Sequence, residues 1–263
     1  MSSLDDLFAR CREEGRAALI GYLPAGFPSY DLSVAAMTAM VEAGVDAVEV
    51  GMPYSDPLIE GPVIQAAHQA SLDAGTRQAD VLRAVQAVAT TGAPTLVMGY
   101  WNPVHRYGFR RWAQALKDVG GVGAITPDLI PEEAPEWLEA CRELDLDPVF
   151  LVAPSSTDER IAVVGRTNRG FIYAAAVMGV TGARAEVGAG ARELVARVRK
   201  QSALPVAVGL GVSTGAQAAQ VAGFADGVVV GSALVTALED HGVDGVRRLA
   251  AELAEGVRAP VRT

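Results

Sequence analysis

The amino-acid sequence predicts an α/β fold, a single (β/α)₈ barrel with an extra N-terminal helix. Short runs rich in Val, Ile, Leu and Ala alternate with longer amphipathic stretches, and there are eight such runs. The runs lack a period-2 alternation of apolar and polar residues, which indicates parallel strands that helices cover on both sides. Dividing 263 residues among eight units gives about 33 residues per unit, close to the ~250-residue size of a TIM barrel. Residues 1–263 are therefore predicted to form one domain.

The predicted strands are the eight apolar runs, residues 17–23, 46–50, 94–98, 122–126, 148–152, 170–174, 205–208 and 227–230. Helical patterns fill the gaps, for example at residues 32–42, 109–119, 135–144, 192–200 and 215–221, and the additional helix covers residues 4–14. A Gly or a Pro stands just before several strands, at Gly44, Pro94, Gly121, Pro148 and Pro205. This punctuation is typical of the loops that lead from a helix into the next strand of a βα repeat.

An open, doubly wound sheet is the alternative architecture for alternating strands and helices. Such a sheet normally carries the pattern G-x-G-x-x-G after its first strand, where the loop holds a pyrophosphate. Here the first strand is followed by residues 24–28, a stiff turn with the sequence PAGFP. No linker or low-complexity tract interrupts the chain, so we favour the barrel.

Composition and charge argue against several classes of protein. Hydrophobic residues make up 50% of the chain and charged residues 20%, which suits a compact core. The net charge of -9 repels nucleic-acid phosphates and anionic lipids, so we expect no nucleic-acid or membrane partner. Cys11 and Cys141 stand in charged, helix-like sequence and predict neither a disulfide nor a metal site. With no signal peptide and no apolar run of ~20 residues, we expect a soluble cytoplasmic protein.

Glycines follow the seventh and eighth predicted strands, at residues 209–213 and 231–232, and each segment leads into a helix. Glycine lets backbone amides approach an anion, and a helix N-terminus adds a positive dipole end. The alternative interpretation is that these glycines only make tight turns. Because barrels of this type bind phosphate after strands seven and eight, we favour a phosphate site formed by both loops.

Two carboxylates follow the second strand. Glu49 lies at an otherwise apolar strand end, so burial should raise its pKa toward neutrality and suit it to proton transfer. A structural carboxylate paired with an arginine is the alternative for Glu49. Glu60 lies eleven residues further, in a loop bounded by Gly and Pro. This loop could bring Glu60 to the same end of the barrel as Glu49. The alternative, which a single loop carboxylate would most often be, is a solvated charge.

The few lysines and histidines limit the chemistry of the barrel mouth. Lys117 and Lys200 fall in helical patterns on the outer ring, so a Schiff-base mechanism lacks its amine. The three histidines lack metal-ligand spacing, which argues against zinc. We expect His68 and His241 to be surface helix residues, whereas His105, in the loop after the third strand, could contact a substrate. We therefore expect acid–base catalysis by carboxylates on a substrate that is bound through its phosphate group.

The loop after the sixth strand, residues 177–188, is long and rich in small residues, and it contains an arginine. These features suggest a lid that closes over a bound phosphate ester and excludes water. The alternative is a loop that remains open to solvent. The neighbouring phosphate site favours the lid.

Taken together, these segments resemble the alpha subunit of tryptophan synthase over essentially the whole chain. The matching stretches are residues 21–28, 49–65, 100–103, 126–133, 179–184, 209–213 and 231–232. The resemblance implies retro-aldol cleavage of indole-3-glycerol phosphate to indole and glyceraldehyde 3-phosphate, with no metal and no organic cofactor. It also implies a pyridoxal-phosphate beta subunit as partner in an alpha2beta2 heterotetramer, docked through residues 53–57 and 128–133.

The resemblance also implies roles for individual residues. Glu49 matches the glutamate that protonates the indole ring carbon and helps to deprotonate the glycerol hydroxyl, and Tyr173 matches the tyrosine beside it. Glu60 matches the acid that receives the indole N–H proton. The positions that match substrate-binding residues are Tyr22, Tyr100 and Leu151 around the indole, Thr181 in the lid, and Gly182, Gly211, Gly231 and Ser232 around the phosphate.

Glu60 departs from the family pattern, which usually has Asp at this position. The extra methylene displaces the carboxylate by about 1.5 Å, enough to matter where catalytic geometry is tight. Two alternative functions therefore stay open at this point. One is a stand-alone lyase that releases free indole, and the other is a weakly catalytic subunit that regulates its partner.

Overall fold

The computed structural model describes residues 2–176 and 189–261. Its strands form one parallel sheet in the order β5-β4-β3-β2-β1-β9-β8-β7-β6. Their bounds are β1 Ala18–Pro24, β2 Ala47–Gly51, β3 Thr95–Met98, β4 Gly123–Ile125, β5 Asp147–Val149, β6 Leu151–Val152, β7 Ile172–Ala175, β8 Val206–Gly209 and β9 Gly227–Val230. Each predicted apolar run overlaps a strand, with bounds that differ by at most two residues, and the α/β barrel prediction is confirmed.

The sheet closes because β5 and β6 are two parts of one strand. They stand at opposite ends of the strand order, yet only Phe150 separates them in the chain. The side chain of Asn168 accepts a hydrogen bond from the Phe150 amide at 3.1 Å and donates to the Phe150 carbonyl at 3.0 Å. An amide side chain thus satisfies the backbone where the ladder is interrupted, and the barrel has eight strand positions.

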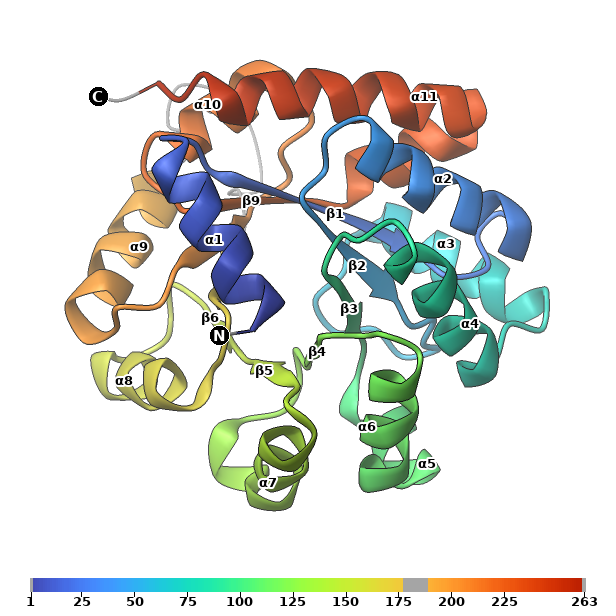
Figure 1. The fold of residues 1–263 in the computed structure, drawn as a ribbon, viewed down its shortest axis with the longest axis horizontal. Helices are drawn as coiled ribbons and strands as arrows, with labels where there is room; N and C mark the ends of the chain where they lie inside the picture. Colours follow the sequence, from blue (N-terminus) through green and yellow to red (C-terminus); the bar gives the residue numbers. More distant parts are fainter. Residues whose placement is uncertain (1, 177–188, 262–263) are drawn as a thin grey trace.

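Helices surround the strands, as the ring in Figure 1 shows. Their bounds are α1 Ser3–Glu13, α2 Tyr30–Glu42, α3 Pro62–Asp73, α4 Gln78–Ala89, α5 Trp101–Tyr107, α6 Phe109–Asp118, α7 Pro135–Leu144, α8 Asp158–Thr167, α9 Ala189–Gln201, α10 Gly215–Ala222 and α11 Ser232–Arg258, with a 3₁₀ turn at Pro131–Glu133. Within α11, Gly242 has φ 61° and ψ −159°, so two helices meet there at a kink. A residue without a Cβ tolerates this positive φ best.

The predicted N-terminal helix closes one end of the barrel. Ser2 caps α1, because its side chain accepts from the Asp5 amide while the Asp5 carboxylate accepts from the Ser2 amide. Leu4, Leu7 and Phe8 are buried in the same apolar cluster as the inward-facing residues of the strands. In Figure 1, α1 lies in front of the strands. The helix therefore seals the N-terminal end, so that the opposite end remains as the mouth.

Two further observations bear on the sequence predictions. Cys11 and Cys141 are both buried free thiols, and burial raises the pKa of Cys11 to about 11. Across residues 2–176 and 189–261, no helix is both long enough and apolar enough to span a bilayer.

Leu7→Ala should lower the free energy of unfolding by roughly 2–5 kcal/mol, because it leaves a cavity between α1 and the barrel interior. Leu32→Ala is the matched control, since Leu32 is 44% exposed and its truncation should change stability by less than about 0.5 kcal/mol. Urea unfolding measures both variants. Equal losses in the two variants would contradict the role assigned to α1.

Candidate active site

Three polar side chains face into the barrel at its mouth. Successive side chains of a strand point to opposite faces, and Ile20 of β1 and Ala47 of β2 belong to the inner core. Tyr22 and Glu49, two residues further along the same strands, therefore point into the barrel, and they are direct partners in the β1–β2 register. Tyr173 of β7 belongs to the inner cluster itself. The fold thus brings together three residues that the sequence placed on separate strands.

Glu49 is fully buried, and among the described residues neither of its carboxylate oxygens has a hydrogen-bond partner. The desolvation of the carboxyl raises its pKa to about 8. The alternative interpretation, a structural ion pair with an arginine, finds no support among the residues that the structure describes. At neutral pH Glu49 is mainly protonated, which suits a general acid that later acts as a base.

The Tyr173 side chain lies against Gly209 of the neighbouring strand β8, where a larger residue would collide with it. A Cβ at Gly209 would stand 2.7 Å from the Tyr173 hydroxyl. Burial and the charge of Glu49 raise the pKa of Tyr173 well above its ordinary value, so this phenol keeps its proton. Leu151, the register partner of Tyr173 on β6, is half-buried at the same level of the barrel.

Glu60 is held over the mouth by Tyr100. The Tyr100 hydroxyl donates to the Glu60 carboxylate and accepts from the amides of Leu58 at 2.6 Å and Ile59 at 3.1 Å. Tyr54 stacks on the Tyr100 ring at a centroid distance of 4.7 Å. Burial and the bond to Glu60 raise the pKa of Tyr100 to about 12. Tyr100 thus fixes the loop between β2 and α3 as well as the Glu60 side chain.

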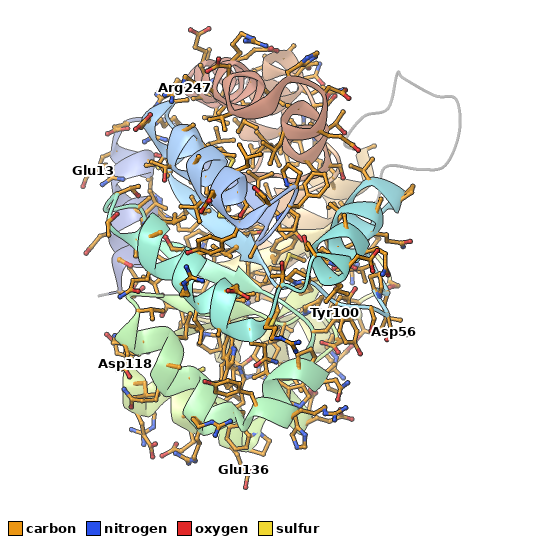
Figure 2. The ribbon with its side chains drawn as sticks, turned by 90° about the vertical axis from the view of Figure 1, so that its right-hand side faces the viewer. Glu13, Asp56, Tyr100, Asp118, Glu136 and Arg247 are labelled. Carbon is orange, nitrogen blue, oxygen red and sulfur yellow. The ribbon has the colours of Figure 1, made fainter. Side chains whose placement is uncertain are left out.

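Figure 2 shows where this loop lies in the molecule. Tyr100 and Asp56, which belongs to the β2–α3 loop, are on one side of the barrel. Glu13, at the end of α1, is on the opposite side. The carboxylates and tyrosines therefore gather at the end of the barrel that α1 leaves open.

The phosphate site stays a prediction, and the N-terminus of α11 has the features that it requires. The first amides of α11 follow Gly231, and such amides have no partner within their own helix. Gly211 has φ 78°, and a Cβ at this position would meet open space. Gly231 lies against Tyr22, whose Cδ1 would be 3.2 Å from an added Cβ. Gly211, Gly231 and Ser232 thus leave room for an anion beside the mouth.

The second helix N-terminus expected at this site is occupied by its own side chains. The Gly215 amide donates to Glu252 at 2.8 Å, and the Gln217 amide donates to Thr214 at 3.2 Å. The Ser213 amide donates to the Gln217 side chain at 2.8 Å. Three amides at the start of α10 thus already have acceptors, which leaves fewer for an anion there than at α11. The expectation that both helix N-termini serve the anion stays a prediction.

Thr181, Gly182 and the predicted lid of residues 177–188 lie outside the described residues. Their roles stay predictions.

The histidine predictions were only partly correct. His68 was expected on the surface, but it is 2% exposed, and its Nε2 lies 2.7 Å from the Tyr22 hydroxyl. His105 is exposed and lies in helix α5, not in a loop. His241 is exposed on α11 and Lys117 lies on the outer helix α6, both as expected.

The bonds to Tyr100 and His68 were missed because neither partner is close in sequence. Forty residues separate Tyr100 from Glu60, and 46 separate His68 from Tyr22. The sequence did offer one signal for His68, because Ala67 and Ser71, the other buried residues of α3, are both small. Small neighbours indicate a face packed closely against the barrel.

Glu49→Gln should stabilise the protein increasingly as pH rises. A folded-state pKa near 8, above the ordinary value of 4.5, means that the folded protein binds more protons than the unfolded chain between these two values. The contribution of Glu49 to stability is therefore fully present below pH 4.5 and lost as pH rises through 8. Since one pKa unit corresponds to about 1.4 kcal/mol, Glu49→Gln should have a free energy of unfolding about 3–5 kcal/mol above that of the wild type at pH 9.

Urea unfolding of both proteins at pH 4.5 and pH 9 measures this gain. Glu255→Gln, which removes a carboxylate from an exposed position of α11, is the control for the substitution itself. The same gain for Glu49→Gln at both pH values would contradict the raised pKa.

Comparison with known proteins agrees with this geometry. The family model described as tryptophan synthase alpha chain matches residues 8–259. The chain is 56% identical over 257 residues to the tryptophan synthase alpha chain of Mycobacterium intracellulare, covering 98% of this chain and 95% of the relative. It is 54% identical over 261 residues to the corresponding chain of Acidothermus cellulolyticus, covering 98% of each.

Solved structures show the same relationship. A crystal structure of tryptophan synthase from M. tuberculosis, the open form with BRD0059 bound, superimposes with a TM-score of 0.92 and 54% identity, covering 98% of this chain and 99% of the other. The tryptophan synthase subunit alpha of Legionella pneumophila superimposes with a TM-score of 0.88 and 31% identity, covering 98% of each chain. The chain belongs to the tryptophan synthase alpha chain family.

Proposed function

We propose that this chain carries out the reaction of its family at the barrel mouth, with Glu49 as the central acid and base. The reaction is the lyase cleavage of indole-3-glycerol phosphate to indole and glyceraldehyde 3-phosphate in tryptophan biosynthesis. The observation that carries the assignment is the fully buried, unpartnered Glu49 carboxyl with a pKa of about 8. A poised carboxyl in a dry barrel is what proton transfer at neutral pH requires.

In the proposed mechanism, the protonated Glu49 gives its proton to the indole ring carbon that carries the glycerol chain. The ring becomes an electron sink, and the Glu49 carboxylate then accepts the proton of the adjacent glycerol hydroxyl. The carbon–carbon bond breaks, its electron pair returns to the indole ring, and the alkoxide carbon becomes the aldehyde of glyceraldehyde 3-phosphate. Tyr173 lies beside Glu49 with its proton retained.

Glu60 is proposed to accept the indole N–H proton as the ring carbon is protonated, and to return it to the nitrogen when the electron pair of the broken carbon–carbon bond restores the aromatic ring. The Tyr100 hydroxyl gives the Glu60 carboxylate a fixed place, despite the longer side chain at this position. The departure from the usual Asp is thus matched by a phenol that bonds the longer acid. This match favours a working enzyme over a weakly catalytic regulatory subunit.

The remaining site residues are proposed to hold the substrate. Tyr22 and Leu151 would border the flat indole, and Tyr100 would do so while it holds Glu60. The free amides of Gly231 and Ser232, together with Gly211, would bind the phosphate through the N-terminus of α11. Thr181 and Gly182 are proposed to close over the site as part of the lid.

A beta subunit that uses pyridoxal phosphate is the proposed partner, in an alpha2beta2 complex in the cytoplasm. Leu58 and Ile59 are 75% and 51% exposed at the tip of the β2–α3 loop, and Ile130 is 39% exposed on the loop after β4. Exposed apolar side chains at the mouth suit a contact with another subunit. A partner bound there would order the Glu60 loop and raise the lyase rate.

The experiment that tests this function follows indole release from indole-3-glycerol phosphate, with and without a beta subunit. Turnover that rises on complex formation supports the proposal. Substantial turnover without any complex in analytical ultracentrifugation would favour a stand-alone lyase. No turnover under either condition would contradict the proposed reaction.

Glu49→Gln should lower kcat by at least 10²–10⁴-fold with little change in KM, because the amide keeps the shape of the side chain but cannot exchange protons. The indole-release assay measures both constants, and a folded variant is verified by its unfolding curve. If the variant retains a tenth of the wild-type kcat, Glu49 is not the acid and base of this reaction.

Glu60→Asp should lower kcat by up to about 10²-fold, because the shorter acid moves away from the Tyr100 hydroxyl and from the substrate. Tyr100→Phe should also lower kcat, and combining it with Glu60→Asp should cost less than the sum of the single effects. Single-turnover indole formation measures all three variants. A rise in kcat for Glu60→Asp would show that the pocket is still built for the shorter acid.

A further inference from the structure

Helix α3 is attached to the mouth through a buried hydrogen bond. Nε2 of His68 on α3 lies 2.7 Å from the hydroxyl of Tyr22 on β1. Both side chains are buried, at 2% and 4% exposure. Among the described residues, this is the one side-chain hydrogen bond that joins α3 to a strand.

The rest of the contact between α3 and the barrel is small. The buried residues of α3 are Ala67, His68 and Ser71. The Ser71 hydroxyl donates to the Ala67 carbonyl within the helix, so it makes no bond to a strand. Ile64 packs against the core while partly buried, so the apolar contact of α3 is modest and non-directional. The hydrogen bond of His68 adds the directional contact that sets the exact position of the helix.

The loop that carries Glu60 is held at two places, by Tyr100 at its side chain and tip and by α3 at its C-terminal end. Glu60 is followed directly by Gly61, the N-cap, and by Pro62, the first residue of the helix. The Gln65 side chain donates to the Glu60 carbonyl at 2.8 Å, which ties the loop to the first turn. A shift of α3 would therefore move Glu60 relative to Glu49.

Tyr22 is confined from two further sides. A Cβ at Gly51 would collide with the Tyr22 hydroxyl, and a Cβ at Gly231 would contact its ring at 3.2 Å. The same Cβ would stand 3.5 Å from Cδ1 of Ile64 on α3. Tyr22 is thus confined beside Glu49, and the hydrogen bond from His68 attaches α3 to it.

We propose that His68 is a positioning residue for the cleavage reaction, because its hydrogen bond to Tyr22 fixes α3 and thereby the Glu60 carboxylate over the mouth. This inference rests on the proposed role of Glu60. His68 touches Tyr22 and acts through α3, so it is not itself a catalytic residue.

The hydrogen bond is one between neutral groups. Burial lowers the pKa of His68 to about 4, so the imidazole is uncharged at neutral pH. Among the described residues, Nδ1 has no hydrogen-bond partner. A buried N–H without an acceptor is rarer than an unpaired acceptor, which favours the form in which Nε2–H donates to Tyr22. A glutamine amide at position 68 can make the same donation.

The test compares three variants on the full chain with its beta subunit. His68→Leu removes the hydrogen bond and keeps a similar volume, whereas His68→Gln retains a donor for Tyr22. Ser71→Ala is the matched control, because it removes a buried polar group from the same helix face without touching the barrel. Indole-release kinetics give kcat and KM, and hydrogen exchange read by mass spectrometry reports on residues 58–73.

His68→Leu should lower kcat about tenfold, with KM within about twofold and faster exchange in residues 58–73. His68→Gln and Ser71→Ala should stay within about threefold of the wild-type kcat. The loss of kcat should largely disappear in a Glu60→Gln background, since there is then no carboxylate to position. A residue that only stabilises the fold would not show this dependence on Glu60.

The proposal is overturned if His68→Leu keeps kcat within about twofold of wild type, or if its loss is the same in the Glu60→Gln background. Should His68→Leu fail to fold, Tyr22→Phe removes the same hydrogen bond from the other side. It should speed exchange in residues 58–73, and its loss of kcat should shrink in the Glu60→Gln background, whereas unchanged exchange would overturn the proposal. Without any wild-type turnover the proposed function fails, and the exchange data still report on His68. Unchanged exchange in His68→Leu would then overturn the positioning role.

Discussion

The site depends on a closed barrel whose interior excludes water from Glu49. Closure requires β5 and β6 to act as one strand across Phe150, and Asn168 satisfies the backbone at that point. At the other end, α1 covers the interior with Leu4, Leu7 and Phe8. The carboxyl at the mouth is left without a polar partner among the described residues, and burial raises its pKa to about 8.

The second carboxylate, Glu60, differs from Glu49 in that several hydrogen bonds hold its side chain and its loop. Tyr100 bonds the Glu60 side chain and the amides of Leu58 and Ile59. On the other side of Glu60, α3 is attached to β1 through His68 and Tyr22. Glu49 is thus held on a strand without a polar partner and Glu60 on a loop with several, a difference that fits the distinct proton-transfer roles proposed for the two acids.

The N-termini of α10 and α11, both at the proposed phosphate site, differ in whether side chains bond their first amides. Both α10 and α11 begin just after a barrel strand, but Thr214, Gln217 and Glu252 accept the amides at the start of α10. The helix α11 begins after Gly231, without a capping side chain. The N-terminus of α11, beside Tyr22, therefore has more open amides than that of α10, which supports the proposed role of α11 in binding the phosphate.

The sequence by itself determined the barrel, its N-terminal helix and the placement of Glu49, because strand burial and the position of a residue on a strand follow from local patterns of apolar residues. Its resemblance to the family extended this to Tyr173, Glu60 and the glycines. Only the tertiary structure decided that His68 is buried, that Tyr100 bonds Glu60 and that α10 is capped by Glu252. These contacts join residues far apart in the chain, so no local pattern contains them.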